Sequence, residues 1–98
     1  MNVKYGLLAR LEARPGRADE VAELLQSARD LALAEPGTVT WYAFKMGDNT
    51  FGVFDTFADE EARRAHLAGQ IPIALGKVAS ELLSAEPLID EVTIVAVK

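Results

Sequence analysis

The sequence predicts one α+β domain in which a four-stranded antiparallel sheet carries two helices on one face. Its strand-like and helix-like segments follow in the order βαββαβ, and the two central strands are joined by Gly-Asp-Asn, a typical hairpin connection. Because crossover connections are right-handed, both helices fall on the same side of the sheet. A length of 98 residues suits a single domain, which we assign to residues 1–98.

The first two elements are a strand over residues 4–13 and an amphipathic helix over residues 18–34. The strand shows two-residue alternation, and Pro15 with Gly16 ends it. In the helix, apolar positions recur every three or four residues, which is the spacing of one helix face.

The predicted hairpin combines two segments rich in aromatic and β-branched residues, 39–46 and 50–57. Before it, Glu35-Pro36-Gly37-Thr38 ends the first helix, because the residue before a proline disfavours helical geometry. We expect Gly37 to turn the chain back with positive backbone angles.

Pairing Met46 with Thr50 sets the register of this hairpin. The register places Trp41 opposite Asp55 and Val39 opposite Phe57 on one face. On the reverse face it places Tyr42 opposite Phe54. Both faces are too apolar for water, and two helices cover only one of them. We therefore expect the other face to pack sheet to sheet against a second copy of the chain, as a homodimer.

The second helix is predicted to start at Asp59, a natural N-cap, and to be kinked or broken by Gly69 and Pro72. Arg63 and Arg64 are expected to form a solvated face with the neighbouring glutamates. A final strand is predicted over residues 88–97.

The composition excludes several classes of function. The net charge is -5 and no run of Lys and Arg occurs, so we expect no nucleic-acid partner. The sequence has no cysteine and one histidine, which argues against disulfides, iron–sulfur clusters and a metal site. It has no signal-like layout and no apolar run near twenty residues, so we expect a cytoplasmic protein without membrane association.

His66, Asp55 and Trp41 are the main candidates for a functional site. His66 lies on the inward side of the second helix, as a general base or hydrogen-bond donor, or bonded only to backbone or water. Asp55 is an acid in an apolar strand and needs a partner, which is either a site group or a nearby arginine or backbone group. Trp41 is either a stacking surface or a core residue. Tyr5 lies on a strand face that lines the same cleft, or in the core or its rim.

Four stretches of the chain follow one another in an informative order. Glu35-Pro36-Gly37-Thr38 follows the first helix, and Trp41 comes next. Phe54-Asp55-Thr56-Phe57 ends the hairpin, and Asp59-Glu60-Glu61-Ala62 leads to Ala65-His66-Leu67. Together they resemble the antibiotic biosynthesis monooxygenase family of the dimeric α+β barrel superfamily, which includes quinol-monooxygenase-like proteins. That family usually has Tyr in the place of Trp41, and an aromatic residue, Glu, any residue and Trp in the place of residues 54–57.

The resemblance implies a ferredoxin-like βαββαβ fold whose sheets meet in a homodimeric barrel, with a pocket between sheet and helices in each protomer. It also implies an oxidoreductase, a monooxygenase that acts with O2 on a small phenolic or quinol-like aromatic molecule. No metal, flavin or other cofactor is needed, because the electron-rich substrate supplies the electrons to oxygen. In this function His66 would assist deprotonation or hold the substrate oxygen, and Asp55 would orient a polar partner. Trp41 and Phe57 would form an aromatic wall.

The chain also departs from the family. A second histidine often follows the first by a few residues, whereas this chain reads Ala68-Gly69-Gln70-Ile71-Pro72-Ile73. Leu75 and Ala9 occupy the places of the proximal His and first-strand Asn of the haem-degrading branch, which argues against haem degradation. Two other functions stay open: a dimer that binds or sequesters a small ligand without turnover, and an O2-independent isomerase or decarboxylase of the same superfamily.

Overall fold

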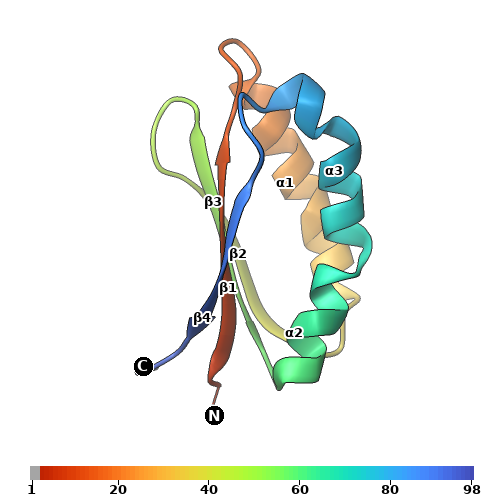
Figure 1. Cartoon of the computed structure of the whole chain (residues 1–98), viewed down its shortest axis with the longest axis vertical. Helices are drawn as coiled ribbons and strands as arrows, with labels where there is room; N and C mark the ends of the chain where they lie inside the picture. Colours follow the sequence, from red (N-terminus) through yellow and green to blue (C-terminus); the bar gives the residue numbers. More distant parts are fainter. Residues whose placement is uncertain (1–2) are drawn as a thin grey trace.

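A computed structural model describes residues 3–98 and confirms the predicted α+β fold and the order of its elements. Strands β1 (Tyr5–Glu12), β2 (Thr38–Lys45), β3 (Thr50–Phe57) and β4 (Leu88–Thr93) form an antiparallel sheet in the order β2-β3-β1-β4. Helices α1 (Ala18–Leu33), α2 (Glu60–Leu67) and α3 (Gln70–Leu82) lie on one face of this sheet (Figure 1). Strand β1 begins and strand β4 ends at the same end of the sheet as α2 (Figure 1).

The second helix is broken, as predicted, into α2 and α3. Asp59 caps the start of α2, where its side chain accepts a hydrogen bond from the Ala62 N–H at 2.8 Å. The break falls at Ala68 and Gly69. Pro72 lies in the first turn of α3, where its missing N–H breaks no helical hydrogen bond.

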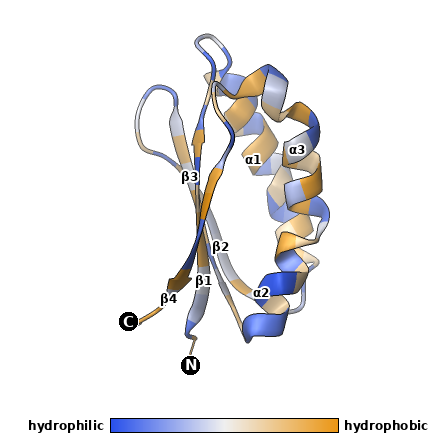
Figure 2. Ribbon diagram, in the orientation of Figure 1, coloured by the Kyte–Doolittle hydropathy of each residue, from blue (hydrophilic) through white to orange (hydrophobic). Residues whose placement is uncertain are grey.

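The main core lies between the sheet and the helices α1 and α3. Its buried side chains are Leu11, Ala13, Val21, Leu25, Phe51, Leu82 and Leu83. Figure 2 shows hydrophobic residues along α1 and α3, whereas α2 is largely hydrophilic. The polar helix α2 therefore lies beside the core rather than over its centre, and its few inward side chains are available for other roles.

The hairpin register is confirmed near its turn and differs at its far end. Met46 N–H donates to the Thr50 carbonyl at 2.8 Å, and Trp41 lies opposite Asp55. Val39, however, is not opposite Phe57. A bulge between Thr38 and Thr40 leaves Val39 as the extra residue and places Thr38 opposite Phe57. Bulges re-aim side chains, and this one turns Thr38 toward the helix-covered face.

Strand β4 is shorter than predicted, since it ends at Thr93 rather than at residue 97. Its partner β1 begins at Tyr5, which pairs with Thr93. One further bond joins the Ile94 N–H to the Lys4 carbonyl at 2.7 Å. Beyond it the chain leaves the sheet, and Val95 is 95% exposed.

Arg63 was expected on a solvated face, and this expectation is wrong, because Arg63 is buried. Its guanidinium lies across the end of β1 and β4, where it donates to the carbonyls of Gly6 at 3.4 Å and Val92 at 3.3 Å. It also lies over the Tyr5 ring, 5.4 Å from the ring centre. Arg64 does pair at the surface with Glu60, at 3.3 Å.

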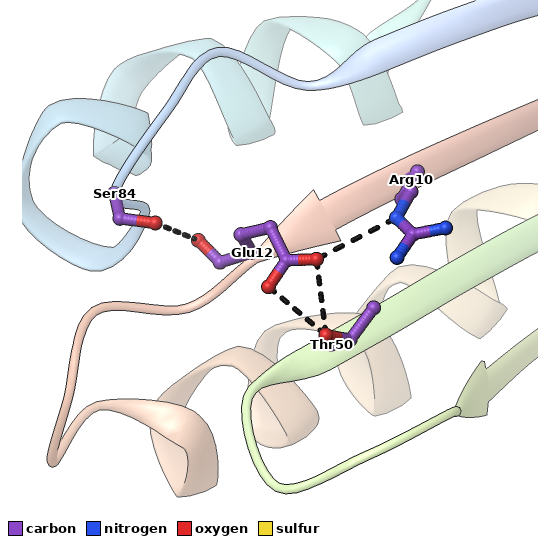
Figure 3. Close-up of polar contacts among 4 residues, drawn as sticks. All are labelled: Arg10, Glu12, Thr50 and Ser84. Atoms are coloured by element: carbon purple, nitrogen blue, oxygen red, sulfur yellow. Dashed lines mark hydrogen bonds and ion pairs between the residues drawn. The ribbon is translucent and has the colours of Figure 1, made fainter.

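The sheet face away from the helices, here called the open face, carries exposed apolar side chains. They include Leu8, Tyr42, Phe44 and Leu88, of which Tyr42 is 58% and Leu88 65% exposed. The Phe44 ring lies directly over Gly52, which has no side chain to displace it. A polar cluster borders this apolar patch: Thr50 Oγ1 donates to both carboxylate oxygens of Glu12, and Arg10 Nε lies 3.5 Å from Glu12 (Figure 3).

Gly37 is required for close packing, and the expectation of a positive backbone angle is wrong. Among the described residues only Gly16 has a positive φ, of 82°. A Cβ atom on Gly37 would lie 2.5 Å from the Cβ of Ala62 in α2. The loop after α1 therefore rests directly on α2, and the absence of a side chain sets their separation.

Replacing Gly37 by Ala should destabilise the fold by about 1–3 kcal/mol, because the added methyl group overlaps Ala62. Gly76→Ala is the matched control, since a Cβ there meets nothing within 4 Å and lies inside α3. It should stabilise the protein by about 0.5–1 kcal/mol. Urea unfolding measures both effects, and equal stability of the two variants would contradict the packing argument.

Candidate functional site

The site begins on β3, where Asp55 points toward the helices. Strand alternation places Asp55 on the same face as Phe51, Val53 and Phe57. Asp55 lies between Trp41 of β2 and Leu7 of β1, its partners in the two neighbouring strands. Only 2% of Asp55 is exposed. An acid at this depth needs a polar partner.

His66 of α2 is that partner. Its Nε2 atom lies 3.1 Å from Asp55 Oδ2. The imidazole is buried and lies against the Phe57 ring, with 5.1 Å between the ring centres and a tilt of 48°. The Phe57 ring therefore packs against the imidazole ring of His66.

Glu35, in the loop after α1, holds the other nitrogen of His66. Glu35 Oε1 lies 2.6 Å from His66 Nδ1 and accepts a second hydrogen bond from Thr38 Oγ1 at 2.7 Å. The bulge at Val39 turns Thr38 toward this carboxylate, and the contact between Gly37 and Ala62 holds the loop against α2. The imidazole is thus bonded at both nitrogens to carboxylates.

The two carboxylates determine the charge of His66. Burial by itself would lower the pKa of His66, but the hydrogen bonds and negative charges of Asp55 and Glu35 outweigh it and raise the pKa above its usual 6.5. When protonated, the imidazole directs one N–H group toward each of the two carboxylates. With a carboxylate beside each nitrogen, the imidazole has no nitrogen free for a ligand.

Asp55 and His66 lie at the wall of a cavity between the sheet and the helices, here called the inner cavity. Its volume is about 90 Å³, several times the ~10–15 Å³ that one water needs. Its lining is mainly apolar and includes Leu7, Leu24, Leu25, Leu31, Val53, Leu67, Ile71, Leu75 and Ile89. Trp41 and Ser27 also line it. This is the composition of a small-molecule site with a few polar groups.

Trp41 also has an unused hydrogen-bond donor. Its indole Nε1 is buried and has no hydrogen-bond partner among the described residues. Most buried indole N–H groups are paired. Trp41 thus lies opposite Asp55, lines the inner cavity and carries a buried donor without a partner in this part of the chain.

The structure brings three of the five predicted site residues to the inner cavity: His66, Asp55 and Trp41. Phe57 lies behind the imidazole, and Tyr5 lies under the Arg63 guanidinium. The predicted functional roles of all five residues stay predictions.

Sequence reasoning missed Glu35 as a site residue and treated it only as the end of a helix. The sequence did contain one signal for it. Glu35 is an acid in a loop and is followed three residues later by Thr38, and the single inward histidine needed a polar partner. The pairing itself joins residues 31 positions apart, so it depends on how the loop packs on α2.

The described residues, 3–98, contain no group of three or more His, Cys, Asp or Glu side chains arranged to hold a metal ion. In the same part of the chain, no helix has the length and apolar character required to cross a membrane.

The fold and the site define a class: small α+β proteins with an apolar cavity and an ionisable cluster at its wall. The sequence profile of the antibiotic biosynthesis monooxygenase family matches residues 5–70, and the chain belongs to this family. Comparison with curated proteins gives no match.

Several solved structures share the fold of this chain. A protein of unknown function from Nitrosomonas europaea is 52% identical, with a TM-score of 0.95 over 98% of this chain and 93% of that one. A Pseudomonas aeruginosa protein is 20% identical, with a TM-score of 0.82 over 98% of both chains. A structure described as an antibiotic biosynthesis monooxygenase is 18% identical, with a TM-score of 0.77 over 96% of this chain and 99% of that one. The last two similarities establish the fold alone.

The raised pKa of His66 predicts how stability depends on pH. The folded protein binds the imidazole proton more tightly than the unfolded chain, so this contribution is complete below about pH 6.5 and is lost as pH rises through the folded-state pKa. With one histidine and no cysteine, His66 dominates side-chain titration in this range. Urea unfolding from pH 6 to 9 should show declining stability in the wild type and a flatter profile in His66→Gln. The same decline in both would contradict the assignment.

Proposed function

We propose that this protein is a cofactor-independent monooxygenase that acts with O2 on a small phenolic or quinol-like aromatic molecule. The observation that carries the proposal is the buried pair of Asp55 and His66 at the wall of an apolar cavity. Membership of the antibiotic biosynthesis monooxygenase family supports it. An apolar cavity suits an aromatic ring, and a buried carboxylate suits a hydroxyl proton.

The geometry favours Asp55, rather than His66, as the group that takes the substrate proton. Each nitrogen of His66 already faces a carboxylate oxygen, at 2.6 Å for Glu35 and 3.1 Å for Asp55, so neither nitrogen faces a substrate. Asp55 uses Oδ2 for His66, which leaves Oδ1 for a substrate hydroxyl. In this assignment His66 keeps Asp55 in place, and Trp41 provides a stacking surface with an indole N–H that can donate to a second substrate oxygen.

Deprotonation prepares the substrate for reaction with O2. Loss of the hydroxyl proton to Asp55 makes the ring a better electron donor, and the ring then passes electrons to O2. One oxygen atom enters the ring and the other leaves as water, so that a quinol and O2 give a hydroxyquinone and water. The substrate is the reductant, and the protein contributes binding, orientation and proton transfer.

An oxygen electrode tests this function with a panel of hydroquinones and anthrones. Wild-type protein should accelerate O2 uptake with at least one compound, and Asp55→Asn should lower the rate by about 10²-fold or more. Glu23→Gln, on the exposed side of α1, is the control and should behave as wild type. No uptake above buffer with any compound would reject the proposal. A bound compound recovered unchanged would instead favour sequestration, and turnover without O2 would favour isomerisation or decarboxylation.

We also propose that the protein is a homodimer joined through the open face of the sheet. Exposed Leu8, Tyr42, Phe44 and Leu88 form an apolar patch on this face, and patches of a few hundred Å² are typical of interaction sites. Glu12 and Thr50 lie at its border and match the polar rim of protein interfaces, and Arg10 joins them from a position between Leu88 and Gly52 (Figure 3). A second copy presents the same self-complementary surface.

Analytical ultracentrifugation at micromolar concentration should give twice the mass of one chain for the wild type. Tyr42→Glu places a charge within the patch and should shift the protein to monomer. Leu33→Glu is the matched control, because Leu33 is 67% exposed on α1, away from the open face, and should leave the mass unchanged. A monomeric wild type would disprove the dimer.

A further inference from the structure

His66 separates two hollows of the molecule. One is the inner cavity, where His66 meets Asp55. The other is a groove on the outer side of α2, here called the outer groove, which is lined by His66, Glu35, Thr38, Asp59 and Glu61 among others. One imidazole therefore borders an apolar interior and an acidic, solvent-facing surface.

The three bonded groups become more exposed from the inner cavity to the outer groove. Asp55 is 2% exposed and His66 is 7% exposed, whereas the Glu35 side chain is 23% exposed. The connecting distances, 3.1 Å from Asp55 to His66 and 2.6 Å from His66 to Glu35, are both hydrogen-bond lengths. A proton can pass between Glu35 and His66 along an existing hydrogen bond.

We propose that Glu35, His66 and Asp55 form a proton-exchange path between the inner cavity and the outer groove, with Glu35 as its solvent-facing end. This inference rests on the proposed function for its biological purpose. When an aromatic ligand fills the inner cavity, Asp55 has no direct contact with bulk water. The path through Glu35 is then the remaining connection to solvent, and it bypasses the ligand.

The proton steps balance without any further reactant. The substrate O–H bond breaks as an O–H bond forms on Asp55, so this carboxyl becomes neutral. His66 has then lost one of the two anions that favour its cationic form. Its Nδ1–H bond breaks as an O–H bond forms on Glu35, and Glu35 gives this proton to water. The proton from the substrate stays on Asp55 and Nε2 keeps its hydrogen, so one proton enters the cluster from the inner cavity as another leaves it at the outer groove. The reverse steps restore the imidazolium when Asp55 returns its proton to the reduced oxygen.

The surroundings of Glu35 suit an exchanging carboxylate. Thr38 Oγ1 and His66 Nδ1 both bond to Oε1, so these two bonds leave Oε2 for water. A Cβ atom on Gly69 would lie 3.3 Å from Oε2, and glycine at this position leaves that oxygen uncrowded. The other acids of the groove, Asp59 and Glu61, add negative charge that favours protons near its surface. Glu35 acts through His66 and is a positioning residue rather than a catalytic one.

The path can be tested in the protein without substrate, since His66 is the only histidine and gives one unambiguous set of imidazole NMR signals. With 15N-labelled histidine, transfer of magnetisation from water measures how fast the Nδ1 proton exchanges. Glu35→Gln retains an oxygen that accepts the Nδ1–H bond but does not take up a proton. We expect exchange at least tenfold slower in this variant. Exchange at the wild-type rate would overturn the proposal.

Two further variants keep the test informative. Glu61 lines the outer groove but does not bond to His66, so Glu61→Gln should leave the exchange rate unchanged. If Glu61→Gln slowed exchange as much as Glu35→Gln, the proposed path would be wrong. Glu35→Ala opens space beside Nδ1, so added formate should restore exchange in proportion to its concentration. No acceleration by formate would overturn it. Because no turnover is involved, failure of the oxygen-uptake assay would leave this result intact.

Discussion

The bond between His66 and its two carboxylates is the interaction on which the site depends. It joins three parts of the fold: β3 through Asp55, α2 through the imidazole, and the loop after α1 through Glu35. An imidazole held between two carboxylates requires fixed geometry of all three groups, because a buried charge without its partner is costly. The loop, the strand and the helix must therefore hold their positions together.

Small backbone features provide this precision. The bulge at Val39 turns Thr38 toward Glu35, and Gly37 lets the loop rest on Ala62. The Asp59 cap fixes where α2 begins and so which of its residues face inward. These features explain why α2, the most hydrophilic helix, carries the buried histidine: polar side chains directed inward from it meet polar partners rather than the main core (Figure 2).

The sequence was sufficient for those parts of the structure that follow from a regular period. Two-residue alternation and the Met46–Thr50 pair correctly placed Trp41 opposite Asp55, and the apolar spacing correctly gave α1. Departures from regularity were not predictable in this way. Regular strand alternation does not predict the bulge at Val39. The pattern of charges on α2 likewise did not indicate that the Arg63 side chain lies over the end of the sheet. Glu35 was missed because its partner is distant in sequence.

Because α2 and α3 are separate helices, they contribute different kinds of side chain to the site. The imidazole and its two carboxylates come from α2, β3 and the loop after α1, whereas α3 contributes only apolar wall residues such as Ile71, Ala74 and Leu75. Substitutions in the first turns of α3 therefore reshape the space for a ligand without touching the ionised cluster. The shape of the inner cavity and the polar cluster at its wall thus depend on different segments of the chain.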